Sequence, residues 1–220
     1  MGYEIAVRLV RNGNNIMLLG RDEEKLVKAS KQLKSIKSET FVETIRCNIG
    51  LESDIKRLGD YISERKIITE YLFNNAGIGL FAHASELNSE MIDRAFEANV
   101  KGMMLLTSQI LRITPKEEEL TIVNIMSTSA LVGRAEEAVY CAAKWGARGF
   151  TEALRAELKG TKRNVIAVYP GGMQTDFWKT EGQNRDISGF MDPALVADKI
   201  VNAVMLSNKT LVTDITINRR

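Results

Sequence analysis

The sequence has few of the residues that hold metals or form disulfides. It contains two cysteines and one histidine in 220 residues. Cys47 and Cys141 lie far apart and form no metal-binding or redox motif. The single histidine, His83, cannot build a histidine-based metal site, because such sites need several imidazole or thiolate ligands. We therefore expect no metal centre.

The chain also lacks long apolar runs and a large excess of charge of either sign. No apolar run is long enough to span a bilayer, and no signal-peptide pattern is present. Lys and Arg total 30 against 28 acidic residues, which gives no reason to expect a nucleic-acid or acidic-membrane partner. With 45% hydrophobic and 26% charged residues, the composition is typical of a soluble globular protein. We expect a cytoplasmic protein with one domain, residues 1–220.

Apolar residues alternate between helical and strand spacing along the chain. The expected helices are 3–12, 22–36, 51–66, 89–113, 137–159 and one starting at Asp192-Pro193, and the expected strands are 15–19, 40–46, 71–73, 120–127, 164–169 and 211–217. Strands separated by helices require right-handed crossovers, which predicts an α/β fold with a doubly wound parallel sheet, Rossmann-like. In such sheets ligands bind outside the carboxyl ends of the strands, so residues after each strand are candidate site residues.

Tyr140 and Lys144 are four positions apart on an expected helix, so they share one face. A lysine ammonium near a phenol favours the phenolate. At roughly 5 Å and an effective dielectric of ~20 the interaction is about 3 kcal/mol, or roughly 2 pKa units. Such a shift would bring the tyrosine towards the range in which it exchanges protons near neutrality. The spacing alone is weak support, because such pairs also arise by chance.

The surrounding segments give the pair its context. In order, the chain contains NNAG (74–77), NVKG (99–102), IVNIMS (122–127), YCAAK (140–144) and PGGMQT (170–175). These resemble the signature segments of the short-chain dehydrogenase/reductase family, and the resemblance covers essentially the whole chain. Five segments in this order, each at its expected place on the fold, are highly specific.

The resemblance implies a catalytic role for four residues. Tyr140 would be the general acid in carbonyl reduction and the general base in alcohol oxidation. Lys144 would lower the pKa of Tyr140 and hydrogen-bond the nicotinamide ribose, while Ser127 would hydrogen-bond the reacting oxygen. Asn99 would hold a proton-relay water beside the lysine. Ser127 could instead be a polar strand-end residue and Asn99 a helix kink. Ser129 is an alternative to Ser127, but the spacing to Tyr140 favours Ser127.

The residues after the strand at 15–19 bear on the choice of cofactor. NAD-specific sites place an acid there to bind the ribose hydroxyls, and this chain has Gly20-Arg21 instead. Arg21 can pair with a 2′-phosphate, which favours NADP(H) over NAD(H). It could also be an ordinary surface arginine. Asp22, one position further on, is better explained as a helix cap.

The resemblance implies further contacts with the cofactor. Asn48 stands where the family usually has an aspartate that accepts from the adenine amino group, and its amide oxygen can still accept that bond. After the strand at 71–73, the residues that would line the cofactor are Asn75, Ala76 and Gly77. After the strand at 164–169, those that would cover its nicotinamide side are Pro170, Gly171 and Thr175.

The beginning of the family pattern is absent. The chain opens inside a helix, whereas a doubly wound nucleotide-binding domain starts with a strand and a glycine turn, TGxxxGxG in this family. Gly2 fits the last glycine of that turn. The absent strand should lie between 15–19 and 71–73, leaving two rows of unpaired backbone groups at roughly 1–3 kcal/mol for each buried group. We hypothesise that Met1 is an internal methionine of a longer product. For the 220 residues alone we expect feeble cofactor binding and no useful turnover.

Substrate contacts are expected from an irregular segment at 173–192 and from the loop after Ser127. The apolar side chains there are Phe177, Trp178, Phe190, Leu131 and Met126. They indicate an apolar or mixed carbonyl substrate. Phe177 and Trp178 could instead simply pack the loop onto the core.

The helix at 137–160 carries small residues that permit close packing. It could pair with the helix at 89–113 across a two-fold axis in a homodimer or homotetramer, or pack against the sheet. Functionally, we expect an oxidoreductase that transfers a hydride between NADP(H) and a carbonyl/alcohol substrate. The alternatives are a non-catalytic dinucleotide sensor and a truncated product without independent function.

Overall fold

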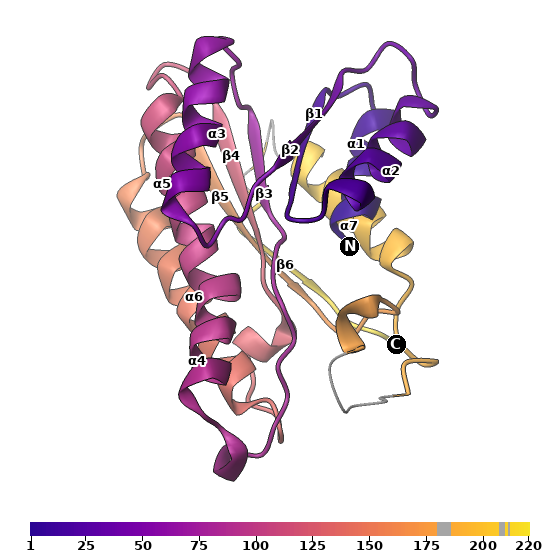
Figure 1. Cartoon of the computed structure of the whole chain (residues 1–220), viewed down its shortest axis with the longest axis vertical. Coiled ribbons are helices and arrows are strands. Elements are labelled where there is room, and N and C mark those ends of the chain that lie inside the picture. The colour runs from indigo at the N-terminus through magenta and orange to yellow at the C-terminus, as the bar shows by residue number, and fades with distance from the viewer. Residues whose placement is uncertain (180–185, 207–209, 211) are drawn as a thin grey trace.

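The computed structural model describes residues 1–179, 186–206, 210 and 212–220 (Figure 1). Helices and strands alternate as the sequence predicts. They are α1 (Gly2–Arg11), β1 (Ile16–Gly20), α2 (Glu23–Lys34), β2 (Val42–Arg46), α3 (Glu52–Glu64), β3 (Tyr71–Asn74), α4 (Ser89–Phe96), α5 (Gly102–Ile113), β4 (Leu120–Ile125), α6 (Ala138–Glu157), β5 (Arg163–Pro170), α7 (Pro193–Leu206) and β6 (Asp214–Ile217). Residues 180–185 of the predicted irregular segment and residue 211 of the predicted last strand lie outside the described residues.

The parallel strands form two separate sheets, one with the order β1-β2 and one with the order β3-β4-β5-β6. Within the described residues, neither β1 nor β3 pairs with a strand on its other edge. These two edges are the ones between which the sequence predicts the absent strand. The doubly wound α/β fold with a parallel sheet is therefore confirmed.

Burial follows this division of the sheet. All six residues of β4, which has neighbours on both edges, are buried. Every residue of β1 is only half-buried, and so are Tyr71 and Phe73 of β3. A parallel strand inside a sheet is normally buried on both faces. The exposure of β1 is thus that of an edge strand, although its apolar sequence suits an interior one.

Helices cover both faces of the four-stranded sheet (Figure 1). Alternate residues of each strand face opposite sides, so Val123 and Ile122 of β4 belong to different cores. The core with α1 and α7 contains Ile5, Leu9, Val123, Ile125, Ile166, Val168, Val196 and Ile200. The core with α3, α5 and α6 contains Ile55, Leu58, Leu106, Ile110, Leu120, Ile122, Leu154 and Val165.

The helix predicted at 89–113 is interrupted by a π-helical turn, residues Glu97–Lys101, between α4 and α5. Asn99 lies inside this turn and is 2% exposed. A π-turn adds a residue to one helical turn and often marks a functional site. On the sequence alone, Asn99 could be a helix kink. The structure places Asn99 in a π-helical turn, with its side chain buried.

Buried side-chain amides of β3 and β4 connect the sheet to α5 and α6. Asn74 Nδ2 donates to Asn124 Oδ1 at 2.8 Å and to Thr107 Oγ1 at 2.9 Å. Asn124 Nδ2 in turn donates to Thr151 Oγ1 of α6 at 3.0 Å. Because each of these polar groups is buried, breaking one contact would leave a desolvated partner behind.

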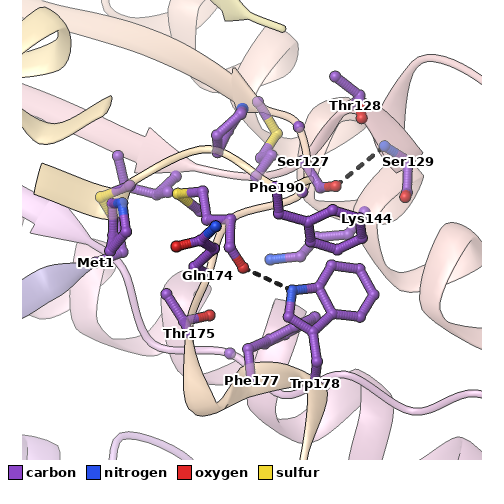
Figure 2. Close-up of a pocket in the computed structure, with 18 of the residues that line it drawn as sticks. Met1, Ser127, Thr128, Ser129, Lys144, Gln174, Thr175, Phe177, Trp178 and Phe190 are labelled. Carbon is purple, nitrogen blue, oxygen red and sulfur yellow. Dashed lines mark hydrogen bonds between the residues drawn. The ribbon is translucent and has the colours of Figure 1, made fainter. Parts of the chain in front are cut away.

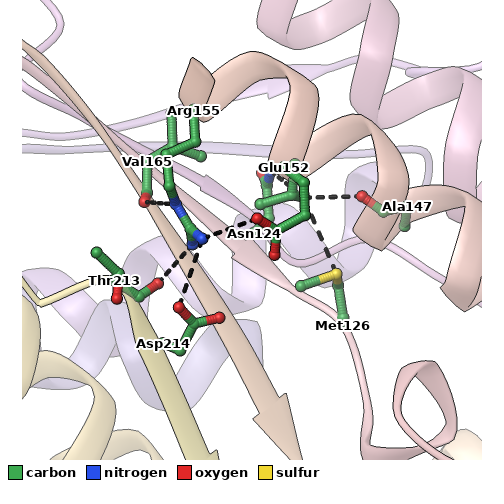
Figure 3. A network of polar contacts seen from close by, with 9 residues as sticks. Asn124, Met126, Ala147, Glu152, Arg155, Val165, Thr213 and Asp214 are labelled. Atoms are coloured by element: carbon green, nitrogen blue, oxygen red, sulfur yellow. Dashed lines mark hydrogen bonds and ion pairs between the residues drawn. The ribbon is translucent and has the colours of Figure 1, made fainter. Parts of the chain in front are cut away.

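A second set of contacts holds the same helix against β5 and β6 (Figure 3). Arg155 Nη2 donates to the Thr213 carbonyl at 2.8 Å, and Nε donates to the Val165 carbonyl at 3.4 Å. The guanidinium also lies 3.4 Å from an Asp214 carboxylate oxygen. Together these contacts fix the register of α6, which carries the predicted tyrosine and lysine.

Candidate active site

A cavity of 920 Å³ opens at the carboxyl ends of β4 and β5, where the fold predicts a ligand site. Its wall includes residues from both ends of the chain, from Met1 to Arg219. Most of the predicted site residues line it. They are Asn75, Gly77, Ser127, Tyr140, Lys144, Pro170, Gly171 and Thr175.

Ser127, Tyr140 and Lys144 meet on one side of the cavity. Figure 2 shows Ser127 and Lys144 among the residues that line the cavity, with the Ser127 hydroxyl oxygen pointing to the Ser129 amide. Tyr140 and Lys144 are each 5% exposed, and Lys144 Nζ lies 5.7 Å from the centre of the Tyr140 ring. The shared helix face predicted from the spacing is therefore present.

The protonation of the pair differs from the sequence-based expectation. Burial raises the pKa of Tyr140 above its usual value of 10, a hydrogen bond with Ser127 opposes this rise, and the Glu137 and Cys141 side chains add to it. Burial also lowers the pKa of Lys144 from 10.5 to about 8. The expected lowering of the Tyr140 pKa by Lys144 is thus not found here. The sequence argument used a dielectric suited to a surface pair, and desolvation of the phenol outweighs it.

Asn99 lies behind the cavity wall. Its Nδ2 donates to the carbonyls of Ile78 and Ala95, both at 3.0 Å, while no donor among the described residues reaches its buried Oδ1. A Cβ atom added to Gly77 would lie 2.6 Å from that oxygen and 3.4 Å from Lys144 Nζ. The Asn99 oxygen and the Lys144 amine therefore lie next to the same glycine. A buried carbonyl oxygen of this kind normally binds a water or a ligand group.

The start of α1 lies against the NNAG segment. A Cβ atom added to Gly2 would come within 2.6 Å of Asn75 Nδ2, so a larger residue there would require the Asn75 side chain to move. Met1 and Tyr3 both line the cavity. Gly2 thus occupies the tight helix junction that the sequence assigns to it.

The residues predicted for the adenosine half of the cofactor do not line the cavity. Arg21 is exposed directly after β1, and its carbonyl accepts from Arg46 Nε at 3.4 Å. Asn48 follows β2, and its Oδ1 already accepts from the Gly50 amide at 3.1 Å. A carbonyl oxygen has a second lone pair, so a further donor can still bind there. Ala76 is likewise not part of the wall.

Aromatic rings close the cavity beside Tyr140. Phe81 stacks on Trp178 with ring centres 5.3 Å apart, and Phe177 lies 5.6 Å from Tyr140. Phe190 meets Trp178 edge-on at 5.1 Å (Figure 2). The cavity wall includes Phe177, Trp178 and Phe190. Contact with the substrate and packing of the loop were considered as alternatives, but the same side chains both line the cavity and pack together.

Two further outcomes concern the apolar residues. Met126 lines the cavity, whereas Leu131 is not in its wall. Phe81 was not predicted from the sequence, and its position in the loop after NNAG was the signal that could have found it. Trp178 Nε1 donates to the Met173 carbonyl at 2.9 Å, which fixes the orientation of the indole.

The sequence argument also missed a polar part of the wall. Glu137 is 3% exposed, and its Oε2 accepts from Ser129 Oγ at 2.9 Å. Arg134 Nη2 donates to Thr128 Oγ1 at 3.1 Å. All four line the cavity. The position of Glu137, three residues before Tyr140, was the available signal, because residues three apart at a helix start share a face.

In the described part of the chain, no helix has both the length and the hydropathy to cross a membrane. The same residues contain no group of three or more His, Cys, Asp or Glu side chains arranged to hold a metal ion.

The fold is of the doubly wound type that places ligands at the carboxyl ends of its strands, where this cavity lies. The family of short chain dehydrogenases matches residues 1–186, and the chain belongs to this family. It is 29% identical over 176 residues to a sepiapterin reductase of Chlorobaculum tepidum, covering 80% of this chain and 71% of the relative.

Two solved structures show the same fold. A short-chain dehydrogenase/reductase from Vibrio parahaemolyticus is 32% identical with a TM-score of 0.84, covering 100% of this chain and 92% of the other. An actinorhodin polyketide ketoreductase variant with NADPH is 27% identical with a TM-score of 0.86, covering 98% and 90%.

Proposed function

We propose that this protein is an NADP(H)-dependent oxidoreductase that interconverts a carbonyl compound and its alcohol, with Ser127, Tyr140, Lys144 and Asn99 as its catalytic set. The observation that carries the proposal is the convergence of the first three on one cavity, with the unpaired Asn99 oxygen behind Gly77. Because this cavity has wall residues from both chain ends, we propose that residues 1–220 act as one domain.

The residues around the nicotinamide end fit a bound dinucleotide. The Asn99 oxygen has no partner within residues 1–179, 186–206, 210 and 212–220, Gly77 leaves room beside it, and Lys144 Nζ lies close by. These groups can bind ribose hydroxyls and an ordered water. When bound, the nicotinamide would supply or accept the hydride at the carbonyl carbon.

Tyr140 would donate the proton in reduction. A tyrosine phenol is protonated at neutral pH, which is the form a general acid requires, and burial raises its pKa further. The Ser127 hydroxyl would donate a hydrogen bond to the same substrate oxygen, where negative charge develops. Lys144, with a pKa of about 8, can carry a proton or release it near neutrality. The Asn99 oxygen would hold the water through which that proton is replaced.

Arg21 supports NADP(H) over NAD(H). It lies at the carboxyl end of β1, next to a glycine where an NAD site would have an acid. The likeness to a ketoreductase that holds NADPH supports the same choice. Asn48 would accept from the adenine amino group. Asn75, Ala76 and Gly77 would line the cofactor, and Pro170, Gly171 and Thr175 would cover its nicotinamide.

The aromatic wall favours a substrate with a flat or apolar body. Phe177, Trp178 and Phe190 present ring faces and edges to the cavity beside Tyr140. The likeness to a sepiapterin reductase agrees with a planar ring compound that carries a carbonyl group. We infer an aromatic or mixed carbonyl substrate, without a more specific identity.

We infer a homodimer or homotetramer built through α4 and α6. Ile92 and Phe96 of α4 and Trp145 of α6 are 41%, 39% and 48% exposed, although all are large and apolar. A two-fold axis would bury them against their copies. Size-exclusion chromatography with light scattering tests this: Trp145→Asp should reduce the mass to that of a monomer, and an unchanged oligomer would contradict the interface.

The test of the function is a titration of the chain, and of a form extended upstream by a strand and a glycine turn, with NADPH and NADH. Binding is followed by cofactor fluorescence and melting temperature. We expect the extended form to bind and to prefer NADPH. The non-catalytic dinucleotide-binding reading is the second candidate, favoured by the unpaired edges of β1 and β3. Binding without any turnover of a carbonyl panel would select it.

A further inference from the structure

Glu137 is a buried carboxylate at the start of the catalytic helix, and it does not cap that helix. It is the residue before the first turn of α6, yet its side chain makes no hydrogen bond to the α6 amides. Its Oε2 instead accepts from Ser129 Oγ at 2.9 Å, and both residues are 3% exposed. A desolvated charge-assisted contact of this kind is stronger than a neutral surface contact.

Ser129 also forms a hydrogen bond with Ser127. The Ser129 amide donates to Ser127 Oγ at 3.1 Å, so one residue binds the Glu137 carboxylate through its side chain and the Ser127 hydroxyl through its backbone. Glu137 lies one turn before Tyr140 on the same helix. The contacts therefore link the loop that carries Ser127 to the helix that carries Tyr140.

The backbone around Glu137 holds the carboxylate in this direction. Glu136 has a φ of 63°, the left-handed region, which costs a residue other than glycine about 1–2 kcal/mol. Its carbonyl accepts from the Ala82 amide at 2.8 Å, and Ala82 forms a parallel bridge with Glu137. The Cys141 amide binds the Glu137 carbonyl at 2.7 Å. Strained backbone persists when its surroundings fix it, and it concentrates at functional sites.

We propose that Glu137 is a positioning residue that, through Ser129, fixes the Ser127 hydroxyl in its place beside the Tyr140 phenol. Ser127 and Tyr140 must reach the same substrate oxygen, so their separation sets how well both act at once. This inference rests on the proposed function of the cavity. It adds two residues, Glu137 and Ser129, that would not touch the substrate oxygen themselves.

The carboxylate has an electrostatic consequence as well. Glu137 raises the pKa of Tyr140, in the same direction as burial, and so opposes formation of the phenolate that alcohol oxidation needs. Lys144 on the same helix has the opposite charge when protonated. The other charged residues in the described wall of the cavity are Glu4 of α1, Arg134 of the loop before α6, Asp176, Asp186 and Arg219.

Four variants separate the contact from the charge. Glu137→Gln removes the charge and keeps an oxygen that accepts from Ser129, whereas Ser129→Ala keeps the charge and removes the contact. Glu137→Ala removes both. Glu136→Gln is the matched control, because it removes the neighbouring carboxylate, which is 43% exposed and pairs with His83 outside the cavity.

The first readout needs no cofactor. The exchange rate of the Ser129 amide, measured by NMR on the 220-residue chain, reports its bond to Ser127. We expect Glu137→Ala and Ser129→Ala to raise this rate about fivefold to tenfold relative to the β4 amides. Glu137→Gln and Glu136→Gln should leave it near the unsubstituted value. Equal changes at Ser129 and in β4, or no change in Glu137→Ala, would overturn the positioning role.

The second readout is the pH profile of NADP-dependent oxidation of benzyl alcohol and cyclohexanol, in whichever form of the protein turns over. In Glu137→Gln the rising limb should move to lower pH, because the Tyr140 pKa falls when a nearby negative charge is removed. Glu136→Gln should not move it. Ser129→Ala should lower kcat about tenfold with little change in the KM for NADP.

Amide exchange and the pH profile distinguish failure of the proposed function from failure of the positioning role of Glu137. If no form of the protein turns over any substrate, the proposed function fails, and the Ser129 exchange rates still decide whether Glu137 fixes the loop. If the protein is active and the Glu137 variants behave like Glu136→Gln in both readouts, the further inference is wrong and the proposed function stands.

Discussion

Asn99 Nδ2 lies 3.0 Å from the carbonyl oxygen of Ile78, so the π-turn between α4 and α5 is tied directly to the loop that follows β3. This contact brings Asn99 next to Gly77, and its Oδ1 accepts no hydrogen bond from the part of the chain that the structure describes. The loop after β3 and the π-turn together hold the Asn99 Oδ1 atom at the position where the proposed water would bind. The site thus depends on the absence of a side chain at residue 77.

The first prediction concerns this glycine. Gly77→Ala should place a methyl group 2.6 Å from Asn99 Oδ1 and 3.4 Å from Lys144 Nζ. We expect it to weaken NADPH binding by about tenfold or more and to lower the free energy of unfolding by about 1–3 kcal/mol. Cofactor fluorescence and urea unfolding measure the two effects.

Gly133→Ala is the matched control for that change, because nothing lies within 4 Å of an added Cβ there and its φ is not positive. It should leave cofactor binding unchanged and alter stability by less than about 1 kcal/mol. Similar losses in both variants would contradict the account of Gly77 and Asn99.

The second prediction concerns the general acid. Tyr140→Phe keeps the ring that packs against Phe81 and Phe177 but removes the hydroxyl. In the form that is active, turnover of carbonyls with NADPH should fall about 10²–10⁴-fold, since the proton donor is lost. NADPH binding should remain within a few-fold. Tyr71→Phe, outside the cavity, is the control, and equal losses in the two variants would rule out the assigned role.

The third prediction is a pH dependence of stability. Burial lowers the pKa of Lys144 from 10.5 to about 8, so between these values the unfolded chain binds more protons than the folded chain. Stability therefore increases with pH across this window, by about 3 kcal/mol in total, and the penalty is fully present below pH 8.

Urea unfolding of the unsubstituted chain and of Lys144→Met at pH 7 and pH 10 measures this effect. Lys144→Met should be the more stable of the two at pH 7, with the difference shrinking towards pH 10. Lys28→Met, at an exposed position on α2, should show no such trend. A difference that does not change with pH would show that Lys144 is not desolvated in solution.

The fourth prediction concerns cofactor choice. Arg21→Ala should weaken NADPH binding about tenfold to a hundredfold and leave NADH binding nearly unchanged, because only NADPH carries the 2′-phosphate. Arg94→Ala, which removes an exposed guanidinium paired with Glu90 on α4, is the control. Equal losses of NADPH and NADH affinity in Arg21→Ala would identify Arg21 as a general surface charge.

The sequence predicted the order of the elements because their apolar periods and caps are local. Asp22, for example, caps α2 by accepting from the Lys25 amide, as its position before the charged helix indicated. The family pattern also predicted the two strands between which its first strand would lie. Among the described residues, β1 and β3 pair with no strand on those edges.

The parts that sequence reasoning missed depend on three-dimensional burial. The spacing of Tyr140 and Lys144 gave their shared face but not their desolvation, which reverses the expected shift of the tyrosine pKa. The contact of Phe81 with Tyr140 and the bond between Glu137 and Ser129 depend on the loops that bring these residues together. The π-turn at Asn99 was not predicted either, because the apolar spacing of 89–113 indicates one continuous helix.

The most direct test of the central claim follows the hydride itself. The chain and its upstream-extended form are incubated with NADPH deuterated at C4 of the nicotinamide and with a panel of aromatic and aliphatic aldehydes and ketones, and the alcohols are analysed by mass spectrometry. The account predicts that the extended form yields at least one deuterated alcohol and that its Tyr140→Phe variant yields almost none. Failure of both forms to bind either nucleotide, with no deuterated product, would contradict the assignment as an active oxidoreductase.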